Sequence, residues 1–188
     1  MEPKLQELKA RLIEVNDLRS AALLLSWDQT TYMPPGGAVA RGRQMATLGR
    51  LAHEKFTDPA IGKLLDDLRP YEASLPYDSD EAGLIRVTRR DYEKSVKVPP
   101  SFMAQFYSQA AASYEAWSRA RPANDFAAVQ AHLDRTLDLS RQYANFFPGY
   151  EHIADPLIDV ADYGMKVSTL RVLLADLRER LVPIVQAI

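Results

Sequence analysis

Residues 23–54 read LLLSWDQTTYMPPGGAVARGRQMATLGRLAHE, and this stretch decides the fold. It predicts a helix that stops at a buried Trp27, a bend over residues 34–37 and a second helix that ends near His53. The two prolines of the bend fix φ and remove backbone donors, while the two glycines permit the chain to reverse. No ligand set or nucleophile lies inside the stretch, so we interpret it as architecture.

Apolar residues recur every three or four positions on both sides of this bend, which is the spacing of amphipathic helices. No stretch alternates apolar and polar residues over the length of a strand. We therefore predict an all-α, bundle-like fold of about seven helices in one helical domain or subdomain over residues 1–188. The expected helices are approximately residues 3–26, 38–56, 59–69, 79–97, 101–121, 125–147 and 168–188.

Two local features carry their own expectations. Gly42 and Gly49 lie seven residues apart inside the second helix, and each costs about 1 kcal/mol against alanine. We expect another backbone to approach them closely. The triplet Arg89, Arg90 and Asp91 is interpreted as a solvated helix face.

Charge and cysteine content narrow the classes of partner and compartment. The 23 Lys and Arg nearly balance the 25 Asp and Glu, for a net charge of −2, which gives no reason to expect nucleic acid or an anionic membrane as partner. Cysteine is absent, which excludes disulfides and thiolate metal sites and fits a reducing compartment. The first residues lack the apolar core of a signal peptide, so a cytoplasmic location is the default expectation.

The histidines do not have the spacing of a zinc site. His53, His132 and His152 each lack a second histidine within three to five residues. His53 and Glu54 begin an HExxH motif, but Thr57 takes the place of its second histidine. We therefore expect no metal ligand set and no catalytic residue among the histidines.

Acidic residues offer two further candidates. Asp155, Asp159 and Asp162 form a local cluster, for which capping and solvation are favoured over binding of a hard cation. A divergent metal site built from His53, Asp155 and Asp159 is a weaker alternative. Asp28, beside Trp27 at the expected helix end, is the best single candidate for a functional polar group, although a hydrogen bond within its own loop is the favoured use.

Short motifs follow one another through the whole chain in a specific order. They are WDQ (27–29), MPPGG (33–37), ARGRQMATL (40–48), LAHE (51–54), TDP (57–59), KVP (97–99), W-x-x-A-R (117–121), DF (125–126), Tyr150, LID (157–159) and YG (163–164). In this order and spacing they resemble the N-terminal part of the carboxypeptidase Taq family of zinc metallocarboxypeptidases.

The resemblance implies an all-helical and usually homodimeric enzyme that removes C-terminal residues from peptides held in a deep groove. Family members are considerably longer, and their zinc, for which cobalt can be substituted in tests, sits on an HExxH helix plus a downstream glutamate. Those elements lie C-terminal to the matched region, so none is carried onto a residue of this chain. We expect this chain to be inactive alone, to form a wall or lid of the groove with Asp28 as a candidate groove residue, and to self-associate.

The last predicted helix separates this interpretation from its main alternative. Its apolar pattern runs from Leu170 to Ile188 with no breaker beyond Pro183, which we expect to kink the helix rather than end it. An N-terminal segment of a larger enzyme predicts that this stripe is exposed. A stand-alone helical scaffold that binds a protein partner predicts that the stripe docks on the chain's own core.

Overall fold

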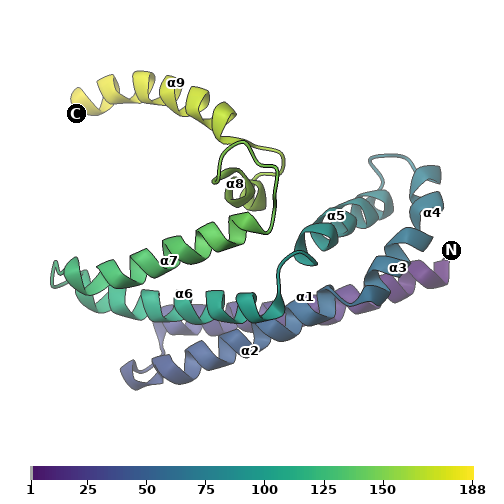
Figure 1. Cartoon of the computed structure of the whole chain (residues 1–188), viewed down its shortest axis with the longest axis horizontal. Helices are drawn as coiled ribbons and strands as arrows, with labels where there is room; N and C mark the ends of the chain where they lie inside the picture. Colours follow the sequence, from purple (N-terminus) through teal and green to yellow (C-terminus); the bar gives the residue numbers. More distant parts are fainter. Residues whose placement is uncertain (1) are drawn as a thin grey trace. The chain divides into compact units, whose positions relative to one another are not determined.

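The computed structural model describes residues 2–188, without the side chain of Pro35, and over these residues it is all-α, as predicted (Figure 1). Two compact units make up the chain, Met1–Thr136 and Leu137–Ile188, and each is described by itself. The elements in order are α1 (Glu2–Thr31), the 3-10 turn η1 (Pro35–Gly37), α2 (Ala38–Phe56), α3 (Pro59–Asp67), α4 (Arg69–Ser74), α5 (Asp80–Ser95), α6 (Pro100–Ala120), α7 (Ala127–Asn145), α8 (Asp155–Ala161) and α9 (Val167–Gln186). The short helices α4 and α8 are additional to the seven that the periodicity predicts.

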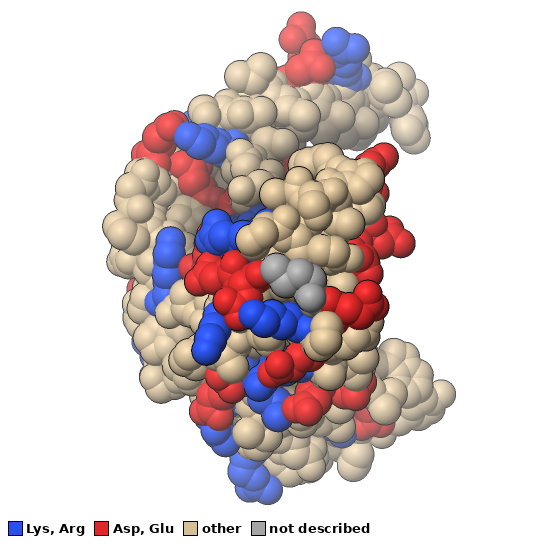
Figure 2. Space-filling model, turned by 90° about the vertical axis from the view of Figure 1, so that its right-hand side faces the viewer, with Lys and Arg blue, Asp and Glu red and all other residues tan. Residues whose placement is uncertain are grey.

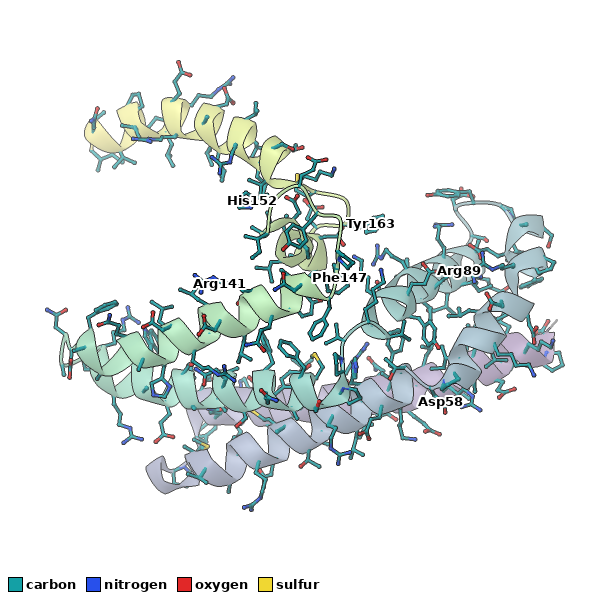
Figure 3. All side chains as sticks on the ribbon, in the orientation of Figure 1. Asp58, Arg89, Arg141, Phe147, His152 and Tyr163 are labelled. Carbon is teal, nitrogen blue, oxygen red and sulfur yellow. The ribbon has the colours of Figure 1, made fainter. Side chains whose placement is uncertain are left out.

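The core of the first unit lies where the beginning of α1 meets α3 and α5. Its buried side chains are Leu5, Leu8, Val15, Phe56, Ile61, Leu64, Leu65, Leu68 and Ile85. The α1 residues in this set recur at helical spacing, so one stripe of the helix is removed from water while its other faces carry charge. Asp58, labelled in Figure 3, caps α3 by accepting the backbone N–H of Ala60 at 2.8 Å.

Helix α2 packs along both α1 and α6, and the three form a layer in the first unit (Figure 1). Gly49 is buried in this layer, and a Cβ at its position would overlap the ring of Tyr107 on α6. The close neighbour of Gly42 is the Cβ of Ala111, at 3.5 Å from an added Cβ. At Gly49 the prediction that another backbone approaches is therefore wrong, because the side chain of Tyr107 fills the space instead.

Helix α1 continues one turn beyond the predicted stop at residue 26 and ends at Thr31. The hydroxyls of Thr30 and Thr31 both donate to the carbonyl oxygen of Trp27, at 2.8 Å each. The side chain of Trp27 is 55% exposed, so the prediction of a buried tryptophan is also wrong. An apolar repeat cannot reveal a turn whose residues are polar but still helical, which is why the boundary was placed too early.

Arg89 on α5 is not on a solvated face, contrary to the prediction (Figure 3). Its side chain is only 13% exposed, and its guanidinium donates to the carbonyl oxygen of Leu65 at 2.7 Å and to the carboxylate of Glu72 at 3.2 Å. Arg89 thus satisfies a helix-end carbonyl of α3 and ties α3 and α4 to α5.

The second unit contains the end of α7 together with α8 and α9. Leu139 and Ala144 of α7 are buried, and the rings of Tyr143 and Phe147 lie 5.1 Å apart between centroids. Helix α9 continues through Pro183 to Gln186, so this proline does not end the helix, and no residue of α9 is buried. The apolar stripe of α9 is thus exposed, as expected for an N-terminal segment of a larger enzyme.

Charges of both signs are interspersed on the face of the first unit that carries α4 and the start of α1 (Figure 2). Ion pairs there include Lys4 with Asp67 at 2.8 Å and Lys9 with Glu81 at 3.5 Å. A mixed surface of this kind does not make the continuous positive field that nucleic-acid binding needs. Among the described residues, none of the helices has both the length and the apolar character required to cross a bilayer.

Candidate functional site

Asp28 lies in the last turn of α1 and joins that helix to α2. Its Oδ2 accepts a hydrogen bond from the guanidinium of Arg41 at 2.5 Å, and the same guanidinium donates to the carbonyl oxygen of Leu25. The Arg41 side chain is 11% exposed and that of Asp28 is 36% exposed. The backbone carbonyl of Asp28 also accepts the N–H groups of Tyr32 and Met33, at 3.0 and 2.9 Å. The site therefore holds the hairpin closed while one carboxylate edge still meets solvent.

Exposed apolar side chains surround this hairpin end. We define the bend surface by its five large exposed members, Leu23, Leu24, Trp27, Tyr32 and Val39, which are between 55% and 83% exposed. The ring of Trp27 meets that of Tyr32 edge-on, with centroids 5.6 Å apart. Large apolar side chains exposed at one hairpin end are typical of a contact with another surface or with a ligand.

A pocket of about 340 Å³ lies between the same hairpin end and α6. Its walls come from Gln29, Met33 and Ala38 on one side and from the Tyr114–Arg119 stretch of α6 on the other. Glu115 and Arg119 form an ion pair at its rim. The lining of the pocket thus combines apolar side chains, such as Met33 and Ala38, with polar and charged ones.

The three histidines have separate structural surroundings. His53 is half-buried, its Nε2 lies 2.7 Å from the carbonyl oxygen of Val98, and burial lowers its pKa. His152, labelled in Figure 3, accepts the N–H of Ala154 at its Nδ1 at 3.1 Å. His132 lines a separate open groove of about 490 Å³ between α6 and the start of α7. The imidazoles of His53 and His152 thus each hold a backbone segment in place through a hydrogen bond.

The aspartates of the second unit hold backbone amides. Asp155 is buried, and its carboxylate accepts the N–H groups of His152 and Val167 at 2.9 Å each. The hydrogen bond from Val167 is the largest of the causes that hold its pKa below the usual range. Asp159 accepts the N–H of Gly164 at 2.6 Å. These contacts support the capping interpretation over the cation site.

A zinc ion does not fit the residues that are present. In the part of the chain that the structure describes, no three His, Asp or Glu side chains are grouped so that they could hold a metal ion. Each member of the alternative ligand set already has a backbone hydrogen-bond partner, as described above for His53, Asp155 and Asp159. The described residues therefore offer no ligand set through which a metal-dependent step could be derived.

Sequence reasoning identified Asp28 but missed Arg41, its partner. The two residues are 13 positions apart on different helices, so no helical spacing connects them. The available hint was an arginine in the first turn of the second helix, facing back across a tight bend.

Comparison with known proteins gives a family match over nearly the whole chain. The family model described as carboxypeptidase Taq (M32) metallopeptidase matches residues 7–188. Thermostable carboxypeptidase 1 of Thermus thermophilus is 31% identical over 173 residues, which are 87% of this chain and 34% of that protein. Carboxypeptidase 1 of Bacillus subtilis is 23% identical over 177 residues, which are 94% of this chain and 35% of that protein.

Solved structures show the same likeness. The M32 carboxypeptidase from Deinococcus radiodurans R1 is 38% identical and superposes with a TM-score of 0.75, covering 99% of this chain and 37% of that one. The crystal structure of BsuCP superposes with a TM-score of 0.90 at 22% identity, over 98% of this chain and 37% of that one, which shows a shared fold. This chain thus spans about a third of the length of the relatives that it matches. The family match and these similarities, taken together, place the chain in the carboxypeptidase Taq (M32) metallopeptidase family.

Proposed function

We propose that this chain is the N-terminal helical part of a metal-dependent carboxypeptidase that removes C-terminal residues from peptides. The observation that carries the proposal is the family match over residues 7–188. The described residues contain no metal-ligand group, and the chain spans about a third of its relatives, so we assign the reacting groups to the remaining part of the enzyme. On this proposal the chain supplies shape to the enzyme and is inactive alone.

The hairpin end of α1 and α2 is the proposed contribution to the substrate groove, as a wall or a lid. The pocket beside it has the mixed polarity of a peptide subsite. Asp28 does not line that pocket, but its side chain is 36% exposed and it is the candidate residue facing the peptide. The bend surface supplies a candidate contact between two copies in a homodimer. The metal, zinc or cobalt, and a cytoplasmic location complete the proposal for the whole enzyme.

A peptide-trimming assay of the purified chain tests its inactivity. With zinc or cobalt added, we expect no release of C-terminal residues from a mixed peptide substrate. We also expect less than about 0.1 zinc per chain after gentle purification, because a metal ion without a set of ligands is not retained. Release of C-terminal residues by this chain alone would overturn the proposal.

A hybrid enzyme tests the positive half of the proposal. This chain would replace the region that it matches in the Deinococcus radiodurans M32 carboxypeptidase, to which it is 38% identical. We expect the full-length hybrid to trim peptides in a metal-dependent way. A hybrid that folds and binds metal but does not trim peptides would contradict the assigned role.

A further inference from the structure

Helix α9 carries one continuous apolar side. We define the α9 stripe as Leu170, Leu173, Leu174, Leu177, Leu181, Ile184 and Val185, which follow one another at steps of three and four apart from two adjacent pairs, 173/174 and 184/185. At 1.5 Å per residue the stripe is about 24 Å long, and at 100° per residue it covers about 120° of the helix. These dimensions are those of a helix face that packs on another helix.

The stripe is open to solvent along this length. Leu173 is 53% exposed, Leu177 is 49% exposed and Leu181 is 48% exposed, and no residue of α9 is buried. Burial of apolar area of this extent is the main favourable contribution to association, so a row of half-exposed leucines indicates a surface that is covered in the working molecule.

The two borders of the stripe differ in charge. On one border Arg180 forms an ion pair with Asp176 at 3.0 Å, within the helix itself. On the other border lie Arg171 and Arg178, both exposed, and neither has an ion-pair partner among the described residues. Since they are seven residues apart, they lie two turns apart on the same edge. A surface that covers the stripe would meet two uncompensated positive charges on this edge.

These features together identify the chemistry of the occupant. We infer, resting on the function proposed above, that the α9 stripe docks an amphipathic helix from the remaining part of the metallocarboxypeptidase, and that this helix carries carboxylates seven residues apart opposite Arg171 and Arg178. Helices that pack at a shallow crossing angle keep residues of equal spacing opposite one another over two turns. The apolar stripe provides the attraction, and the arginine pair fixes the register and direction of the incoming helix.

A second copy of α9 in the antiparallel arrangement fits this surface poorly. When two identical helices pair antiparallel about a two-fold axis, each border faces the same border of its mate. The arginine pair of one copy would therefore face the arginine pair of the other, and like charges at this distance repel. An acidic helix removes that repulsion, which is why the proposal commits to it.

Co-purification tests the docking directly. The whole chain, with an affinity tag, is co-expressed with the part of the Deinococcus radiodurans M32 carboxypeptidase that lies beyond the matched region. We expect Leu177→Asp, in the middle of the stripe, to reduce the recovered partner at least about tenfold. The matched control is Val172→Asp, because Val172 lies off the stripe and is 72% exposed. We expect this variant to recover the partner as the unchanged chain does.

The charged border has its own readout. Recovery of the partner by the unchanged chain should fall as sodium chloride is raised, and the double variant R171E/R178E should both bind less and lose this salt dependence. Circular dichroism of each variant shows whether the helices are retained. Hydrogen exchange gives a second measurement, because amides of α9 should become protected in the complex of the unchanged chain.

Several results would overturn the inference. These are equal losses for Leu177→Asp and Val172→Asp, a salt dependence that survives R171E/R178E, or a dimer of the chain alone that Leu177→Asp dissociates. An active hybrid, together with docking that does not depend on the α9 stripe, would overturn this inference and leave the proposed function standing. A folded but inactive hybrid, together with docking through the α9 stripe, would contradict the proposed function and leave this inference standing.

Discussion

Gly49 is the residue whose size matters most in the layer formed by α1, α2 and α6. A methyl group there would overlap the ring of Tyr107, so Gly49→Ala forces the ring or the helix to move. We expect the free energy of unfolding to fall by about 1–3 kcal/mol, as in other overpacked cores. Chemical denaturation monitored by circular dichroism measures the change.

Gly42→Ala is the matched control for this prediction. The nearest atom to its new methyl group is the Cβ of Ala111 at 3.5 Å, an ordinary contact. Alanine is the better helix former by about 1 kcal/mol, so Gly42→Ala should leave the stability unchanged or increase it. Equal losses in both variants would show that Tyr107 does not limit the space at Gly49.

His53 gives the chain a dependence on pH. Burial lowers its pKa below 6.5, and the hydrogen bond to the carbonyl oxygen of Val98 acts less strongly in the opposite direction. The unfolded chain therefore takes up this proton at a higher pH than the folded chain does. The free energy of unfolding should fall as the pH drops below about 6.5, and His53→Gln should remove this component.

Urea titrations at several pH values from about 8 to about 5 measure the effect as the difference between the unchanged chain and His53→Gln. A difference that stays constant over this range would contradict the prediction.

One set of variants distinguishes a structural role of Asp28 from a role in substrate binding. Asp28→Asn should reduce the stability of the chain by about 1–3 kcal/mol, because Arg41 loses a charged acceptor in a mostly buried place. Combining it with Arg41→Met in a double-mutant cycle isolates the pair, and a positive coupling energy is expected. In the hybrid enzyme, a rise in KM from Asp28→Asn, measured at a temperature where the variant is still fully folded, would show an additional role toward the peptide.

Single residues also show how far sequence reasoning reaches at this scale. Asp28 could be singled out because a carboxylate beside a tryptophan at a helix end is unusual. Its partner Arg41 could not, since the pairing depends on how tightly the bend folds back. Arg89 was misplaced for a related reason, because an arginine among charged neighbours gives no hint that a carbonyl of α3 lies within 2.7 Å.

Among the helices, α9 begins where Asp155 holds its first amide. The Asp155 carboxylate accepts the N–H of Val167, and Asp155→Ala leaves this amide without its partner. We expect hydrogen exchange at residues 167–170 to become several-fold faster, with the middle of α9 unchanged. Asp162→Ala is the control, because Asp162 makes no side-chain hydrogen bond to α9 among the described residues. An equal effect from both variants would contradict the assignment.

The helices themselves followed from apolar spacing wherever one face is buried. The beginnings of α2 and α3 were found because proline, glycine and aspartate mark them. The last turn of α1 and the short helices α4 and α8 were missed, since their residues have little apolar periodicity and are held by local hydrogen bonds. Apolar periodicity reveals helices that bury one face, and these segments are helical although they bury few residues.

Across the whole chain, stability is expected to be uneven. The cluster around Leu65 and Ile85 is almost fully buried, whereas α9 has no buried residue. Limited trypsin digestion should therefore cut after Arg171, Arg178 or Arg180 well before it cuts after Arg89, which is 13% exposed. Mass spectrometry of the first products identifies the cuts, and initial cleavage within α5 would contradict this order.

The family could be recognised from the sequence because its motifs are spread over the whole chain in order, and the match to residues 7–188 confirms it. A metal centre could not be placed from the residues, because none of the three histidines has the spacing of a zinc site. The groove role of Asp28 stays a prediction, because Asp28 does not line the pocket between the hairpin end and α6.

The ion pair between Asp28 and Arg41 also bears on the order in which the chain folds. Its two partners are separated by only 13 positions, so the entropy lost on closing that loop is small. Contacts of this short range form early, ahead of those that wait for distant segments. The hairpin of α1 and α2 is thus suited to take shape on the ribosome while the later helices are still being synthesised, and it would then offer them a ready surface on which to assemble.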